Sequence, residues 1–198
     1  MDNKAKINRF NETLTREANQ ILAAMANISA SDVIEASNHI LNTKGKLIIV
    51  GLGKSGYIGT KLAASFSSMG TPSYFLHATE LFHGDFGSIE DPDMIMLLSH
   101  SGETKEVIEA GNVIKKRGNI ILSITKSKTS SLALLSTTTL AYGEFKEADH
   151  LNMAPTASST VMLAVGDALM VLVSELKHYG KKDFLKNHPG GSLGKQGV

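Results

Sequence analysis

The sequence of 198 residues contains no cysteine and no tryptophan, and it has only four prolines. Without cysteine there can be no disulfide framework, no thiolate metal site and no cysteine nucleophile. The sequence also lacks an excess of either sign of charge, because 20 basic and 19 acidic side chains leave a formal net charge of +1. No basic surface therefore indicates a nucleic-acid or membrane partner.

Long hydrophobic runs are absent as well. The N-terminal stretch MDNKAKINRF has no apolar segment of the signal-peptide type. The longest apolar run, residues 161–173, is interrupted by Gly166 and Asp167, and it is shorter than the roughly 20 residues that a membrane span needs. A hydrophobic content of 42% is ordinary for a globular chain of this length. These features predict a single cytoplasmic domain.

What the sequence does contain is an alternation of short, β-branched runs and helical patterns. The predicted strands are 46–50, 73–76, 94–99, 119–125 and 138–141, and the predicted helices are 5–27, 31–41, 55–68, 78–82, 105–116, 129–135 and 158–178. This alternation predicts an α/β fold in three layers, with a doubly wound, five-stranded parallel sheet of the Rossmann-like or flavodoxin-like kind. We divide the chain into N-terminal helices (1–45), an α/β core (46–180) and a C-terminal tail (181–198).

The predicted helix 158–178 is apolar on nearly every side. Such a helix is expected either inside the sandwich or in a subunit contact. Asp167 within it is then expected to be a buried, hydrogen-bonded residue, because an unpaired buried carboxylate is costly. Together with the amphipathic N-terminal helices, this helix offers more apolar surface than a five-stranded sandwich can easily cover, which predicts a homo-oligomer.

Residues 51–56, GLGKSG, combine fragments of two phosphate-binding motifs. A Walker A loop requires a glycine five positions before Gly53, where this chain has Ile48. The spacing of the glycines matches a dinucleotide fingerprint, but the next strand, Ser-Tyr-Phe-Leu, does not end in the acid that binds a ribose. A glycine turn between a strand and a helix still presents backbone N–H groups to an anion, so Gly53 and Ser55 are candidates. The alternative is a turn that only lets helix and sheet pack closely.

Residues 99–104, SHSGET, form a second loop between a strand and a helix. Ser99, Ser101 and Thr104 supply hydroxyl groups, and Gly102 allows a ligand to approach the backbone closely. The alternative interpretation of Ser101 and Thr104 is simple N-capping. Because the carboxyl ends of parallel strands meet at one edge of a sheet, two such loops together favour a small phosphorylated ligand.

These stretches resemble the sugar isomerase (SIS) domain and, within it, the D-arabinose 5-phosphate isomerases. The resemblance is carried by GLGKSG (51–56), GTPSYFLHATELFHGDFG (70–87), SHSGET (99–104), MAPTASSTVMLAVGDAL (153–169) and HPGGSLG (188–194). It implies interconversion of D-arabinose 5-phosphate and D-ribulose 5-phosphate without a required cofactor. It also implies a homotetramer in which a neighbouring chain supplies His83 or His188.

The resemblance assigns roles to individual residues. The positions that the family uses for activity are Lys54, His83, Glu106, Glu147 and His188. The phosphate would be held by Ser55, Ser99, Ser101 and Thr104. His77 matches a position associated with substrate contact and with inhibitory zinc. Because His77 and His83 flank a short helical stretch, they could approach one another.

Each assignment has a structural alternative. His83 could pair with Asp85, Glu106 could be a favourable charge in the first turn of a helix, and Glu147 and His188 would otherwise be interpreted as surface residues. For an enediolate mechanism the chain offers His188 or Glu147 as the base, His83 for ring opening or the carbonyl oxygen, and Lys54 for charge stabilisation.

The chain also departs from the family pattern. Typical members continue into a pair of cystathionine-β-synthase-type regulatory modules, whereas this sequence ends at Val198, so we expect either a single-domain member or part of a longer chain. Two other functions remain open, a 6-phospho-3-hexulose isomerase and a non-catalytic phosphosugar sensor.

Overall fold

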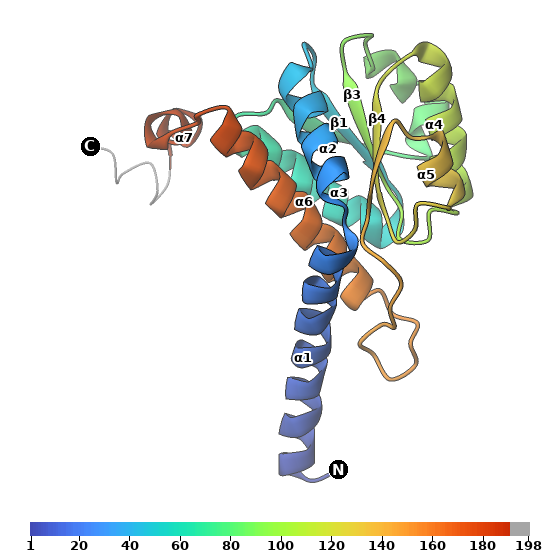
Figure 1. The fold of residues 1–198 in the computed structure, drawn as a ribbon, viewed down its shortest axis with the longest axis vertical. Coiled ribbons are helices and arrows are strands. Elements are labelled where there is room, and N and C mark those ends of the chain that lie inside the picture. The colour runs from blue at the N-terminus through green and yellow to red at the C-terminus, as the bar shows by residue number, and fades with distance from the viewer. Residues whose placement is uncertain (191–198) are drawn as a thin grey trace.

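The computed structural model describes residues 1–190, and its centre is one sheet of five parallel strands in the order β2-β1-β3-β4-β5 (Figure 1). The strands are β1 (Leu47–Gly51), β2 (Ser73–His77), β3 (Met94–Leu98), β4 (Ile121–Thr125) and β5 (Thr138–Ala141). The helices are α1 (Asn3–Asn27), α2 (Ala30–Asn42), α3 (Gly53–Ser68), α4 (Lys105–Arg117), α5 (Ser131–Leu135), α6 (Ala157–Leu176) and α7 (Lys181–Asn187), with short 3₁₀ helices η1 (Glu80–His83) and η2 (Asp85–Ser88). The predicted five-stranded parallel sheet is confirmed.

Two hydrophobic cores lie on the two faces of the sheet. Successive residues of a strand point to opposite faces, so in β1 Ile49 packs with α2, α3 and α6, whereas Ile48 and Val50 pack with α4, α5 and η1. All five residues of β1 are buried, as expected for a strand covered on both faces. The result is the predicted three-layer sandwich.

The register of the sheet places three strand ends at one edge. Gly51, the last residue of β1, is paired with His77 at the end of β2 and with Leu98 at the end of β3. The chain order crosses from β2 on one side of β1 to β3 on the other. Ligands of open α/β sheets bind at the carboxyl edge where the strand order switches in this way, so the fold itself marks the neighbourhood of Gly51.

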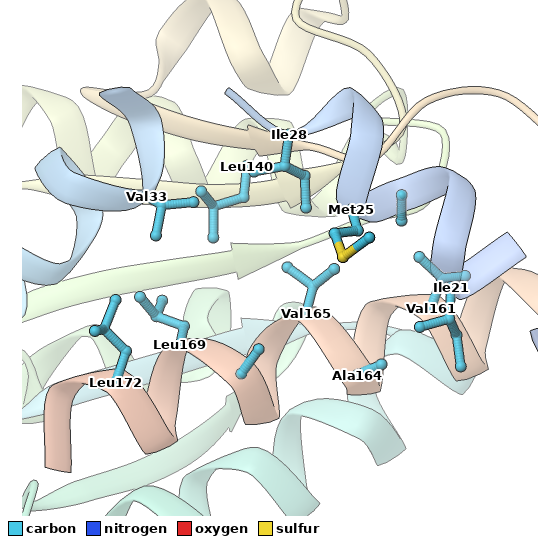
Figure 2. A pocket seen from close by; sticks show the side chains of 12 residues that line it. Ile21, Met25, Ile28, Val33, Leu140, Val161, Ala164, Val165, Leu169 and Leu172 are labelled. Carbon is cyan, nitrogen blue, oxygen red and sulfur yellow. The ribbon is translucent and has the colours of Figure 1, made fainter. Parts of the chain in front are cut away.

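Helix α1 extends away from the sandwich (Figure 1), and its outer part carries exposed apolar side chains. Ile7, Phe10 and Leu14 are each more than half exposed. Where α1 meets α6, a hollow of about 340 Å³ lies between the two helices, lined by apolar side chains such as Met25, Leu140 and Val165 (Figure 2). This surface is suited to burial against another apolar surface.

Helix α6 is long and apolar enough to cross a membrane by length and composition, which is weak evidence because core helices pass the same test. Less than half of its most apolar segment is buried, so the expectation of burial within the sandwich holds only in part. The prediction for Asp167 is wrong in one respect. It does have a partner, Lys61 on α3, with one contact of 2.7 Å, but both side chains are partly exposed.

The observed element ends differ from the predicted ones by one or two residues. Helix α3 begins at Gly53, and β4 begins at Ile121. The side chain of Asn119, just before β4, donates to the carbonyls of Glu90 and Asp93. Helix α7 had no predicted counterpart. Of the predicted C-terminal tail, residues 191–198 lie outside the described residues, so most of the HPGGSLG stretch does too.

Candidate functional site

The loop between β1 and α3 leaves a helix start open. Gly53 has a φ of +58°, a backbone conformation that favours glycine, and it starts α3 directly after the strand. Leu52 occupies the N-cap position and makes no side-chain capping bond. By contrast, α1, α2 and α5 are capped by Asp2, Ser29 and Ser130. The first N–H groups of α3 are therefore available to an anion.

The loop between β3 and α4 is built from its own hydroxyl groups. The Ser99 hydroxyl accepts from the Gly102 N–H (3.1 Å) and lies 2.9 Å from the Thr104 hydroxyl. The Ser101 hydroxyl accepts from the Glu103 N–H (3.1 Å). Thr104 occupies the N-cap position of α4 but makes no side-chain cap bond, so the N-capping interpretation of this motif is wrong. A second open helix start thus lies beside the first.

Helix α5 anchors this second loop. The Leu132 N–H donates to the Gly102 carbonyl (3.0 Å), and the Glu103 carboxylate accepts from the Ser131 N–H (2.8 Å). The hydrogen bonds from Ser131 hold the pKa of Glu103 below its usual value. Glu103 therefore has a structural task that the motif alone did not reveal, since it ties the loop to the start of α5.

Side chains from both loops line one cavity of about 250 Å³. The lining comprises Leu52, Lys54 and Ser55 from the first loop, His100 from the second, and Glu147, Met153, Pro155, Ser158, Ser159 and Met162 from the segment that leads into α6. Because β1 and β3 are parallel neighbours, the two loops face the same crevice, as predicted. Lys54 and Glu147 bring both signs of charge to it.

Glu147 is the most strongly bonded side chain of the cavity. Its Oε2 atom accepts from the N–H and hydroxyl of Thr156 (2.9 and 3.1 Å) and from the Ser158 N–H (3.1 Å), at the start of α6. Burial alone would raise the pKa of Glu147, but the hydrogen bonds from Ser158 and Thr156 outweigh it and leave the pKa below its usual value. Glu147 is thus an ionised carboxylate at neutral pH, and not the solvated surface residue that the sequence alone suggested.

Lys54 is exposed in the first turn of α3. Its Nζ atom lies 5.6 Å from the centre of the exposed Tyr57 ring. No carboxylate within residues 1–190 forms an ion pair with it. The cation is therefore available to a ligand at the mouth of the cavity.

His100 is a cavity residue that the sequence analysis left without a role. Its Nδ1 atom lies 2.8 Å from the hydroxyl of Tyr142, and the two rings stack at an interplanar angle of 13°. Burial lowers the pKa of His100, against an opposing effect from the charge of Glu147. The only sequence signal was its position inside the SHSGET loop; Tyr142, 42 residues further on, gave none.

His188 lies far from the cavity of its own chain. Its Nε2 atom is 2.9 Å from the hydroxyl of Ser68, and its ring stacks on Phe184. Ser68 is the last residue of the 16-residue helix α3, which is roughly 24 Å long, and Lys54 is near its first. Within one chain, His188 and Lys54 therefore do not meet.

The remaining predicted residues His77, His83 and Glu106 do not line the cavity. His77 ends β2 opposite Gly51, and its Nδ1 atom lies 2.7 Å from the Thr79 hydroxyl. His83 is exposed at the end of η1, and within residues 1–190 it forms no ion pair with Asp85. Glu106 is in the first turn of α4. In residues 1–190 no group of three or more His, Asp or Glu side chains is arranged to hold a metal ion, and the zinc contact of His77 stays a prediction.

These features describe an α/β protein whose carboxyl-edge cavity is lined by the open start of α3 with its lysine, by a histidine from the loop before α4, and by a carboxylate. The SIS domain pattern matches residues 39–172. The chain therefore belongs to the SIS domain family, and the resemblance seen in the sequence is confirmed.

Curated relatives are similar in sequence, and a solved structure is similar in both sequence and fold. Arabinose 5-phosphate isomerase KdsD of Pseudomonas aeruginosa is 38% identical over 96% of this chain and 58% of its own length. The KdsD protein of Francisella tularensis is 44% identical over 77% of this chain and 47% of its own. A protein of Escherichia coli CFT073 solved in complex with A5P is 39% identical, with a TM-score of 0.91 over 96% of this chain and all of that one. The chain thus spans about half the length of the curated relatives.

Proposed function

We propose that this protein is an aldose–ketose isomerase that interconverts D-arabinose 5-phosphate and D-ribulose 5-phosphate. The observation that carries the proposal is that one cavity is lined by Lys54 and Ser55 at the uncapped start of α3, by His100 from the loop before α4, and by ionised Glu147. The similarity to relatives named arabinose 5-phosphate isomerases, and to a structure in complex with A5P, supports the choice of sugar.

The phosphate of the substrate is bound between the two loops. The N–H groups at the starts of α3 and α4 point toward an anion there, and the hydroxyl of Ser55 adds a further donor. Ser99 and Ser101 act mainly by holding the second loop in shape, since their oxygens already accept loop N–H groups. These contacts exist both before and during the reaction, so they contribute binding more than rate.

The reaction moves one proton between adjacent carbons of the opened sugar. The aldose loses a proton from C2 to a base, which gives an enediolate with negative charge on O1. O1 then gains a proton, O2 loses one and C1 gains the proton held by the base, which gives the ketose. We assign the base to Glu147, whose Oε1 atom makes no hydrogen bond within the described part of the chain. Substrate binding removes water from the cavity, which raises the basicity of a carboxylate.

Lys54 supplies positive charge where the enediolate oxygens become negative. A preorganised cation at a developing oxyanion is among the largest single contributions to such catalysis. His83 and Glu106 remain candidates for ring opening and for proton transfer to the oxygens.

The assembly that we propose is a homotetramer in which His188 serves the site of another copy. Two observations support it: the distance of His188 from Lys54 in one chain, and the apolar hollow between α1 and α6 (Figure 2) with the exposed apolar residues of α1. Light scattering at micromolar concentration should give about four times the chain mass of 21.1 kDa. A monodisperse species of one chain mass contradicts the proposal.

We propose a cytoplasmic protein that needs no cofactor and binds neither nucleic acid nor membranes; the balanced charge of the chain supports this. Zinc would act as an inhibitor through His77. Exhaustive chelation should leave activity intact, whereas added zinc should reduce it in wild type and less in His77→Ala. Strict dependence on a metal after chelation contradicts this assignment.

The function is tested by incubating the protein with a panel of pentose and hexose phosphates and following isomer formation by NMR. We expect turnover of D-arabinose 5-phosphate and D-ribulose 5-phosphate, and much slower turnover of 6-phospho-3-hexulose. Conversion of the hexulose alone would identify the other isomerase. Binding without any conversion would identify a sensor.

A further inference from the structure

The side chain of His100 lines the cavity in which the proposed phosphosugar would bind. It comes from the loop between β3 and α4, beside the open start of that helix, and it lines the same cavity as Lys54, Ser55 and Glu147. A ligand whose phosphate occupies the two helix starts therefore has its carbon chain next to the imidazole ring.

The ring of His100 is held in one orientation. Its Nδ1 atom meets the hydroxyl of Tyr142 at 2.8 Å. The centroids of the Tyr142 and Phe145 rings each lie 5.8 Å from the centroid of the imidazole ring. Tyr142 is fully buried, and its backbone carbonyl accepts from the side-chain amide of Asn27 (3.2 Å). The support for the ring is therefore part of the core.

The contact with Tyr142 also determines which ring nitrogen carries the proton. Within residues 1–190, Nδ1 of His100 is the only hydrogen-bond partner of the Tyr142 hydroxyl. If Nδ1 were protonated and donated to that oxygen, the buried phenolic proton would have no acceptor, which is costly. The hydroxyl therefore donates to Nδ1, and in the neutral ring the proton sits on Nε2.

The charges around both groups agree with a neutral ring and a protonated phenol. Burial, and then the charge of Glu147, raise the pKa of Tyr142. Burial lowers the pKa of His100, Lys126 acts in the same direction, and Glu147 and Glu144 oppose it. The Nε2–H group makes no hydrogen bond to the described part of the chain, so it is a free donor.

We propose that His100 is a substrate-positioning residue, whose Nε2–H, oriented by Tyr142, donates to an oxygen of the sugar part of the phosphosugar. This inference rests on the proposed function only in taking a phosphosugar as the ligand. Such a donor disfavours a ligand that places no oxygen opposite Nε2, because the N–H group would then be buried without a hydrogen-bond partner.

The central experiment compares three replacements of His100 by calorimetric titration with D-arabinose 5-phosphate and, separately, with inorganic phosphate. The amide nitrogen of glutamine can reach the position of Nε2, whereas that of asparagine reaches only the position of Nδ1. We expect His100→Gln to bind the sugar phosphate within about twofold of wild type, and His100→Asn and His100→Ala to bind it about three- to tenfold more weakly. Inorganic phosphate should bind all four proteins alike.

Two outcomes of the titrations overturn the inference. If His100→Gln loses as much affinity as His100→Ala, the donor at the Nε2 position is not what binds the sugar. If the variants lose affinity for inorganic phosphate in parallel with affinity for the sugar phosphate, His100 only supports the phosphate loop. Thermal unfolding of each variant shows whether a loss comes from misfolding, and the Gln–Asn comparison, with similar polar side chains, remains decisive in that case.

A second measurement does not depend on the substrate. Nitrogen-15 NMR of the imidazole should show an unprotonated Nδ1 and a protonated Nε2 in the wild-type protein, and a mixture of both tautomers in Tyr142→Phe. A protonated Nδ1 in the wild-type protein overturns the inference. Failure of the proposed function can be distinguished from failure of this inference. In that case the tautomer is as stated, but D-arabinose 5-phosphate is not converted. The titrations are then made with the phosphosugar that the NMR panel identifies.

Discussion

The two loops at the carboxyl edge have different support, although each joins a strand to a helix of the same sheet. The loop after β1 is open: a Cβ on Gly53 would meet no atom within 4 Å, and Lys54 beside it is exposed. The loop after β3 is packed: a Cβ on Gly102 would collide with Ser130 and Thr125, and Ser99 is only 2% exposed.

This difference corresponds to two tasks. A cradle for phosphate works best when it is already in its binding shape, because ordering it on binding would cost affinity. A lysine that stabilises developing charge instead needs an ammonium group that is not already paired with a carboxylate. The comparison therefore predicts that changes in the open loop affect turnover, and that changes in the packed loop affect stability and binding.

The largest effect is expected from Lys54→Ala. Loss of a cation that stabilises the enediolate should lower turnover by roughly 10²–10³, with little change in stability. Steady-state kinetics with D-arabinose 5-phosphate measures it. Lys61→Ala is the matched control, because Lys61 lies on the same helix but pairs with Asp167 at the surface. Full turnover in Lys54→Ala contradicts the role.

The nucleotide alternative for this loop can be tested on the same proteins. The loop lacks the upstream glycine of a P-loop, so we expect no tight binding of ATP with magnesium, or of NAD, in a calorimetric titration. Tight binding of either nucleotide means that the loop has been interpreted wrongly.

The next effect separates the two glycines. Both have a positive φ, which costs a residue with a Cβ roughly 1–2 kcal/mol, but only Gly102→Ala adds a collision with Ser130 and Thr125. We expect Gly102→Ala to lower the free energy of unfolding by about 3 kcal/mol, a Tm decrease of roughly 6–12 °C. Gly53→Ala should lose about half as much, and equal losses in calorimetric melts contradict the difference in packing.

Ser101→Ala tests whether the packed loop acts through binding. Its hydroxyl accepts from the Glu103 N–H, and removing it should loosen the cradle and raise KM about tenfold, while kcat changes less than about twofold. Ser136→Ala serves as the control, because within residues 1–190 the Ser136 hydroxyl bonds only to the Leu132 carbonyl. A loss confined to kcat would show that Ser101 takes part in the chemical step.

The smallest effect concerns Glu147 and acid. Its pKa in the folded protein lies below the ordinary value of 4.5, so the folded state holds this proton less tightly than the unfolded state. The stabilisation is fully present above the ordinary pKa and is lost as the pH falls through the folded value. Between pH 7 and about pH 3, the Tm of Glu147→Gln should therefore fall less than the Tm of the wild-type protein. An identical loss in both proteins would falsify the capping role.

Most of the fold was predictable because its signals are local. The β-branched run before Gly51 and the helical spacing of the following segment identified a strand and a helix, and their alternation led to the parallel sheet. The two loops were found for the same reason, since a glycine or hydroxyl cluster between a strand and a helix is visible within a few residues. The carboxyl edge then followed from topology.

The sequence by itself thus determined the sheet, the two loops and the edge at which they meet. Only the tertiary structure decided that Tyr142, which follows β5, orients His100, which follows β3 on the other side of β4. It also decided that Glu147 binds the start of α6 and that His188 rests on the far end of α3. Periodicity reports which side of an element faces the core. It carries no information on which side chains from distant elements meet, because that depends on how the packed layers place them.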